Sequence, residues 1–127
     1  MEKKIVNTTN APAPIGPYNQ SVKYGNMLFV SGQIPLDPAT GNLVEGDIQK
    51  ETEQVMKNLQ AILTEAGMGF ANVIKTSIFL MDMGQFAQVN EVYGSYFDTN
   101  NAPARETVQV SGLPKGVRVE ISMIAGE

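Results

Sequence analysis

The alternation of side chains near the C-terminus constrains the possible folds most. From residue 117 to residue 123 the chain reads VRVEISM, in which every second residue is apolar. Successive side chains of a strand point to opposite faces, so this segment is predicted to form a strand with one buried face. That face needs a covering layer, and the opposite face must be polar or be covered by something else.

Two helices are predicted to supply the covering layer. Residues 48–66 carry their apolar side chains on one side, with Asp47 placed as an N-cap and Gly67 just beyond the C-terminal end. A second helix is predicted to begin at Asp82 or Met83. Its apolar face consists of Phe86, Val89, Tyr93 and Phe97.

About six strands accompany these helices. The predicted segments are residues 4–7, 18–24, 27–31, 73–81, 105–111 and 117–125. Gly25 and Asn26 suit a two-residue type II′ turn, which would pair Tyr24 with Met27. The order of elements predicts a single α+β domain over residues 1–127, with a mixed sheet and both helices on one face.

The last two strands are predicted to form a hairpin. Their apolar residues should face each other, because a one-residue slip would turn every side chain to the wrong face. Thr107 would then lie opposite Glu120, and Arg105 would lie opposite Ser122. All four side chains would share the polar face of the sheet, with Arg105 and Glu120 as diagonal neighbours roughly 7–8 Å apart.

An arginine and a glutamate in that arrangement allow two interpretations. They form a cross-strand ion pair, or they remain free for a ligand. A guanidinium fork binds a carboxylate bidentately, and a nearby carboxylate holds and polarises a water molecule. The second interpretation fits hydrolysis of a small carboxylated imine without a metal.

Three residue types are missing from the chain: cysteine, histidine and tryptophan. Their absence excludes thiolate nucleophiles, cysteine-based zinc sites and the Ser-His-Asp arrangement. The net charge of −4 disfavours a nucleic-acid partner. No apolar stretch approaches the ~18 residues of a membrane span. We therefore expect a cytoplasmic protein that uses no metal, no cofactor and no membrane.

Four segments resemble the RidA/YjgF family of enamine/imine deaminases. They are APAPIGPYNQSV (residues 11–22), GNMLFVSGQIPLDPATG (25–41), FAQVNEVYGSYF (86–97) and PARETVQVSGLPKGVRVEI (103–121). Together with the intervening helix and strand, the resemblance covers nearly the whole chain.

The resemblance implies a chorismate-mutase-like α+β fold that assembles as a homotrimer with active sites between subunits. It implies hydrolysis of 2-aminoacrylate, 2-iminopropanoate and 2-iminobutanoate to 2-ketoacids and ammonia, without a cofactor. Such intermediates leave pyridoxal-phosphate enzymes that act on serine or threonine, and their removal protects other enzymes of that kind.

The resemblance also implies roles for individual residues. Arg105 matches the arginine that clamps the substrate carboxylate, and Glu120 matches the glutamate that orients the attacking water. Further substrate-binding positions are Tyr18, Ser31, Gly32, Asn90 and Thr107. Many members carry cysteine at the position of Thr107, so the pocket wall differs there and the size of the preferred substrate is open.

Two other functions fit the same residues. A binding or regulatory module for small carboxylates such as 2-ketoacids would keep nearly all of them. An endoribonuclease that inhibits translation is less favoured, because the chain is acidic, lacks histidine and has no cluster of cations.

Overall fold

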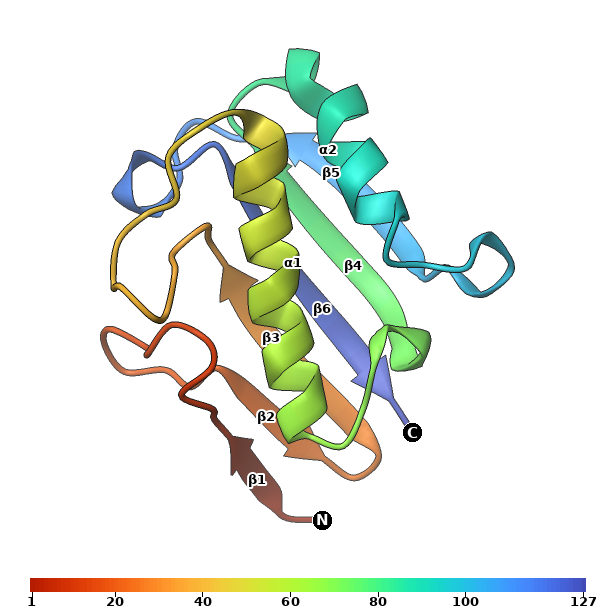
Figure 1. The fold of residues 1–127 in the computed structure, drawn as a ribbon. Helices are drawn as coiled ribbons and strands as arrows, with labels where there is room; N and C mark the ends of the chain where they lie inside the picture. Colours follow the sequence, from red (N-terminus) through yellow and green to blue (C-terminus); the bar gives the residue numbers. More distant parts are fainter.

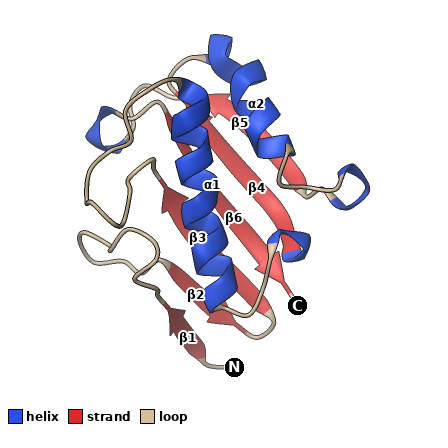
Figure 2. Ribbon diagram, viewed as in Figure 1, coloured by secondary structure: helices blue, strands red, loops and turns tan.

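The computed structural model describes all residues, 1–127, and consists of one sheet with two helices on one face (Figures 1 and 2). The sheet has six strands in the order β1-β2-β3-β6-β4-β5. The strands are β1 Lys3–Val6, β2 Ser21–Tyr24, β3 Met27–Gln33, β4 Val73–Leu80, β5 Ala104–Gln109 and β6 Val119–Gly126. The helices are α1 Ile48–Glu65 and α2 Phe86–Gly94. The predicted α+β architecture is confirmed, and neither helix is long and apolar enough to cross a membrane.

Helix α1 begins and ends where the sequence predicts. The side chain of Asp47 accepts a hydrogen bond from the backbone nitrogen of Lys50 at 2.9 Å. Gly67 follows the helix with a φ of 75°, a left-handed conformation that glycine adopts without strain. The apolar side of the helix, including the fully buried Val55 and Leu59, packs on the sheet and forms most of the core.

The hairpin of β2 and β3 is also confirmed. Tyr24 pairs with Met27, and Gly25 has a φ of 62°, as the first position of a type II′ turn requires. However, β2 begins at Ser21 rather than at residue 18. The loop before it is held by the buried Gln20, whose side-chain amide donates to the carbonyls of Thr8, Ala11 and Pro12. Tyr18 therefore belongs to a pinned loop and not to a strand.

The predicted C-terminal hairpin is wrong. Strand β5 pairs only with β4, in parallel, and β6 runs antiparallel between β3 and β4 (Figure 1). Parallel neighbours need a crossover connection, and α2 provides it between β4 and β5. Residues 110–118 then carry the chain past β4 to the centre of the sheet. Arg118 fastens this return segment, because its guanidinium pairs with the buried Glu51 of α1.

The face of the sheet opposite the helices is not covered within the chain. A row of apolar side chains crosses four neighbouring strands on this open face. It consists of Ile5, Val22, Phe29 and Ile124, which are paired in register from β1 to β6. Ile5 is 41% exposed and Phe29 is 46% exposed, although both lie within the sheet. The open face is thus partly apolar rather than uniformly polar.

Candidate functional site

Arg105 lies on the helix-covered face of the sheet. In β5 it is paired with Thr76 of β4, which is fully buried beneath the helices. Thr107 is paired with the buried Ile78, so it points to the same face. Val108, which the predicted register turned toward the core, is 40% exposed on the open face. The side chains of β5 that point toward the helices are therefore the ones that were predicted to point away from them.

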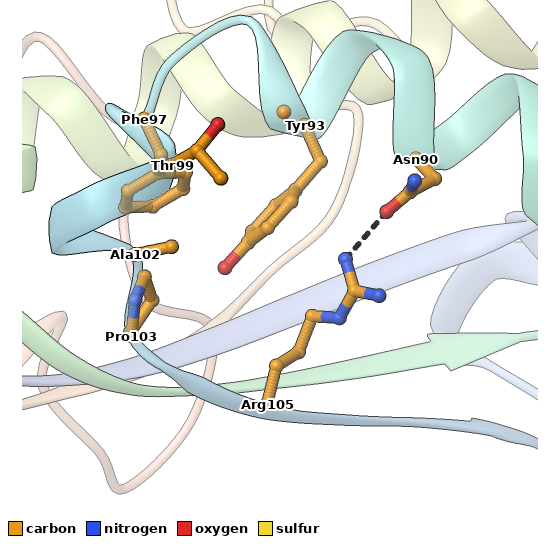
Figure 3. Close-up of a pocket in the computed structure, with 8 residues that line it drawn as sticks. Asn90, Tyr93, Phe97, Thr99, Ala102, Pro103 and Arg105 are labelled. Carbon is orange, nitrogen blue, oxygen red and sulfur yellow. Dashed lines mark hydrogen bonds between the residues drawn. The ribbon is translucent and has the colours of Figure 1, made fainter.

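Helix α2 holds the Arg105 side chain in place. Its Nη1 donates a hydrogen bond of 2.6 Å to Oδ1 of Asn90 (Figure 3). Its guanidinium carbon lies 5.1 Å from the ring centroid of Tyr93 and 5.5 Å from that of Phe86. Every one of these neighbours is uncharged, and no carboxylate forms an ion pair with Arg105. Its positive charge is not neutralised within the chain.

A cavity of about 420 Å³ opens beside Arg105 between α2 and the segment leading into β5 (Figure 3). Figure 3 shows Tyr93 and Arg105 side by side along it, with Asn90 at one end and Phe97 toward the other. Its remaining lining residues are Gly94, Thr99, Ala102 and Pro103. The arginine is therefore reachable by a small molecule.

Glu120 lies on the other side of the sheet. It is paired with Phe79 of β4 and alternates with the buried Val119 and Ile121, so it points to the open face. Its carboxylate packs against the backbone of Gly32, where an added Cβ would lie only 2.7 Å from Oε2. Burial raises the pKa of Glu120, and no hydrogen bond or neighbouring cation offsets that effect. This is an acidic group without a partner.

The other predicted residues near Glu120 come from β3 and the pinned loop. Ser31 donates from Oγ to the backbone carbonyl of Asn19 at 2.6 Å, which ties β3 to the loop that carries Tyr18. Tyr18 is half exposed. Together with Gly32 it lines a second cavity of about 350 Å³. Most other lining residues are apolar, and Lys115 brings the one charge.

Thr107 has an unusual side chain for a site residue. Its Oγ1 is buried and has no hydrogen-bond partner. A buried hydroxyl without a partner costs about 1–3 kcal/mol of stability. The Thr107 hydroxyl therefore makes no hydrogen bond within the chain.

The predicted residues fall into two groups on opposite faces. Arg105 and Thr107 lie on the helix-covered face, where Asn90 contacts Arg105, and Glu120 lies on the open face against Gly32. Ser31 precedes Gly32 in β3, and Tyr18 lines a cavity with Gly32. The prediction that Arg105 and Glu120 share one face is wrong, because β4 separates their strands and the parity of β5 is inverted. The alternative of a direct ion pair between them is wrong for the same reason.

Sequence reasoning missed Phe86 and Tyr93 as neighbours of Arg105. The signal was present, because Phe86, Asn90 and Tyr93 follow one another at spacings of four and three residues and so share one helix face. These aromatic residues were assigned to the core alone.

No group of three or more acidic side chains is placed to hold a metal ion.

Comparisons with known proteins identify the family. The sequence model described as Endoribonuclease L-PSP matches residues 8–127. A RutC family protein of Pyrococcus horikoshii is 53% identical over 97% of both chains. The 2-iminobutanoate/2-iminopropanoate deaminase of Mus musculus is 49% identical over 97% of this chain and 90% of its own.

A solved structure shares the fold at similar length. The crystal structure of Escherichia coli TdcF with bound serine has a TM-score of 0.91 and 44% identity, and covers 98% of both chains. Family model, relatives and structure agree over essentially the full length. The chain belongs to the RidA/YjgF family of proteins.

Proposed function

We propose that this protein hydrolyses 2-imino acids and their enamine tautomers to 2-ketoacids and ammonia. The observation that carries the proposal is the state of Arg105, a cation that is held by uncharged groups and faces an open cavity. A guanidinium has five N–H donors, and Arg105 spends one of them on Asn90. The others are free to grip a carboxylate.

Relatives support this class of reaction. The mouse protein that is 49% identical bears the name of the deaminase, and TdcF holds serine, a small molecule with a carboxylate and an amine. Substrates of the proposed kind are 2-aminoacrylate, 2-iminopropanoate and 2-iminobutanoate. Each has one carboxylate, and the two imines have an electrophilic C=N carbon. The enamine 2-aminoacrylate acquires one when a proton adds to its β-carbon and gives 2-iminopropanoate.

The proposed site lies between two copies of the chain. Arg105 sits at the free edge of the sheet and Glu120 on the open face, so one copy cannot offer both groups to one small molecule. In a homotrimer the β5 edge of one subunit would meet the open face of the next. The exposed apolar row from Ile5 to Ile124 supports such an assembly, because monomers rarely leave a contiguous apolar face in water.

The chemistry needs no strong base. Arg105 binds the carboxylate, and the protonated imine carbon is already electrophilic. Water adds to the C=N bond as the Glu120 carboxylate accepts one of its protons, and the product is a carbinolamine. That proton passes from Glu120 to the amine nitrogen, and the C–N bond breaks as ammonia leaves. The hydroxyl gives its own proton back to the Glu120 carboxylate as it becomes the ketone, and the departing ammonia takes that proton as ammonium. Positioning of water and carbon supplies most of the acceleration.

Ammonia and ketoacid release tests the activity directly. Imino acids are generated in situ by an amino-acid oxidase or by threonine dehydratase, and the rate is compared with the spontaneous rate without the protein. We expect a clear acceleration in the wild-type protein. Saturable binding of 2-ketobutyrate without any acceleration would instead support the non-catalytic binding module.

A mixing experiment tests the shared site. Arg105→Ala and Glu120→Gln chains, each strongly impaired alone, are coexpressed with different tags. In a ring with one Arg105 and one neighbouring Glu120 per site, random mixing restores about a quarter of the sites. Activity in the mixed trimers that stays at the level of the single variants would contradict the shared site.

A further inference from the structure

The Arg105 guanidinium lies over the ring of Tyr93. The ring centroid lies 5.1 Å from the guanidinium carbon, within the range of a cation–π contact. The face of a ring attracts a cation and takes up none of its strong hydrogen bonds. A carboxylate in the same place would hold the arginine more firmly, but it would compete with the carboxylate of a substrate.

The side chain of Tyr93 is itself held in place by contacts with Thr76 and Phe97. Its hydroxyl donates to Oγ1 of Thr76 at 3.0 Å, and both residues are buried, at 4% and 0% exposure. Its ring also packs against Phe97, with centroids 4.7 Å apart. Burial raises the pKa of Tyr93, so the hydroxyl keeps its proton at neutral pH and continues to donate to Thr76. The ring has little freedom to turn away.

Thr76 connects this support to the strand pair that carries the arginine. It stands beside Arg105 in the parallel ladder of β4 and β5. Thr76 therefore contacts the Tyr93 hydroxyl, and the Tyr93 ring contacts the side chain of Arg105, which is the residue paired with Thr76 in the sheet. Asn90 closes the arrangement with the single hydrogen bond to Nη1.

We infer that Tyr93 is a positioning residue, which the Thr76 hydroxyl fixes and which holds the Arg105 guanidinium ready for a substrate carboxylate. This inference rests on the proposed function of Arg105 and adds a residue to it. Tyr93 does not touch the reacting carbon. It acts on carboxylate binding, and its loss should raise KM and the Kd of a ketoacid while kcat changes little.

Four variants test the inference. Tyr93→Leu removes the ring, Tyr93→Phe keeps the ring without the hydroxyl, and Thr76→Val removes the acceptor at constant size. Tyr96→Phe is the matched control, because that hydroxyl bonds to Glu53 and lies outside the surroundings of Arg105. The measured quantities are KM and kcat for imino acids and the Kd of 2-ketobutyrate.

The expected changes follow from the strength of cation–π contacts. Tyr93→Leu should raise KM and Kd roughly tenfold with kcat within about twofold. Tyr93→Phe should restore most of the loss, leaving a two- to threefold rise that Thr76→Val reproduces. Tyr96→Phe should match the wild type. A Tyr93→Phe protein as impaired as one with Arg105→Ala, or a folded Tyr93→Leu protein with unchanged Kd, would overturn the inference.

A spectroscopic measurement separates this inference from the proposed function. The Nε–H resonance of Arg105, assigned by its loss in Arg105→Ala, should carry a ring-current shift in the wild-type protein. The shift should persist in Tyr93→Phe and move in Tyr93→Leu, whether or not imino acids are hydrolysed. An unmoved resonance in Tyr93→Leu would overturn the positioning role. A wild-type protein without ammonia release or ketoacid binding would defeat the proposed function and leave this signal to be judged separately.

Discussion

The β5 edge and the open face of the sheet hold their charged groups in different ways. At the edge, Arg105 has a hydrogen bond to Asn90 and two aromatic rings beneath it. On the open face, Glu120 has only van der Waals packing against Gly32, and burial raises its pKa. The cation is preorganised by neutral groups and the carboxylate is left unpaired. Neither the Arg105 guanidinium nor the Glu120 carboxylate has an oppositely charged partner within its own chain.

Loss of the cation should have the largest effect. Arg105→Ala removes the charge that grips the carboxylate, and breaking such a contact costs about 2–5 kcal/mol, so kcat/KM should fall by about thirtyfold to several thousandfold. The measurement is kcat/KM for imino acids made in situ. Lys57→Ala, which removes an exposed cation on α1, is the matched control and should leave kcat/KM unchanged. Normal ammonia release by Arg105→Ala would remove the edge from the site.

Loss of the carboxylate should act on a different step. Glu120→Gln keeps the shape of the side chain but cannot accept a proton, so kcat should fall by about a hundredfold while 2-ketobutyrate still binds. Isothermal titration gives the second quantity. Equal losses of binding in Glu120→Gln and Arg105→Ala would show that the two halves do not divide the work as proposed.

The contact between Gly32 and Glu120 gives a prediction of intermediate size. A methyl group at residue 32 would lie 2.7 Å from Oε2 and must push the carboxylate aside. We expect Gly32→Ala to lower kcat roughly tenfold, because displacing a catalytic group by about an ångström costs up to about a hundredfold. Gly94→Ala, which meets nothing within 4 Å but borders the other cavity, should be milder. A wild-type kcat in Gly32→Ala would contradict the role of this contact.

The raised pKa of Glu120 predicts how activity and stability depend on pH. Burial raises the pKa of Glu120 in the single chain, and the Arg105 guanidinium of a neighbouring subunit would act against that rise in the proposed site. An acid limb of kcat/KM above the ordinary carboxyl value of 4.5 is expected where burial outweighs that charge, because the anion that orients water is lost as pH falls through the raised pKa. The folded protein binds this proton more tightly than the unfolded chain. The free energy of unfolding therefore falls as pH rises from the unfolded pKa to the folded pKa.

Urea unfolding between the unfolded and the folded pKa of Glu120 measures whether the free energy of unfolding falls as pH rises. Glu120→Gln should abolish that part of the pH dependence and be more stable than the wild type at neutral pH. A destabilised Glu120→Gln protein at pH 7 would mean that the carboxylate has a stabilising partner in solution.

Thr107 should show the smallest effect. Thr107→Val keeps the shape and removes the unpaired buried hydroxyl, so it should stabilise the protein by about 1 kcal/mol. Turnover should change less than about twofold if the hydroxyl takes no part in binding. Thermal unfolding and kcat/KM measure the two quantities. A large loss of turnover would identify the hydroxyl as a ligand for the substrate.

Local patterns predicted the elements well, and pairing across the sheet was the part they could not determine. The cap at Asp47, the turn at Gly25 and the alternation in β6 are set by neighbours in sequence, and all three are confirmed. The partner of β5 depends on α2 and on a return segment, which lie outside any local window. Two valines in a mostly polar edge strand do not determine which side faces the core.

The wrong pairing of β5 affected the prediction of the candidate site more than the prediction of the fold. A wrong neighbour for β5 leaves six strands and two helices in place, but it moves Arg105 to the other side of the sheet. The motifs identified the family, since a motif is read along the chain. The proposed meeting of Arg105 with Glu120 would need a second chain, so it could not be derived in this way.

The apolar row from Ile5 to Ile124 has a consequence for how the protein would behave in a dilute cell extract. If this surface is the contact between subunits, dilution below the dissociation constant separates the trimer. Each monomer then carries only the Arg105 part and the Glu120 part of two different sites and no complete site. The trimer concentration would then fall with the third power of the monomer concentration, so activity per milligram would fall with its square rather than stay constant. The abundance of the protein would itself set a threshold for protection against reactive imines.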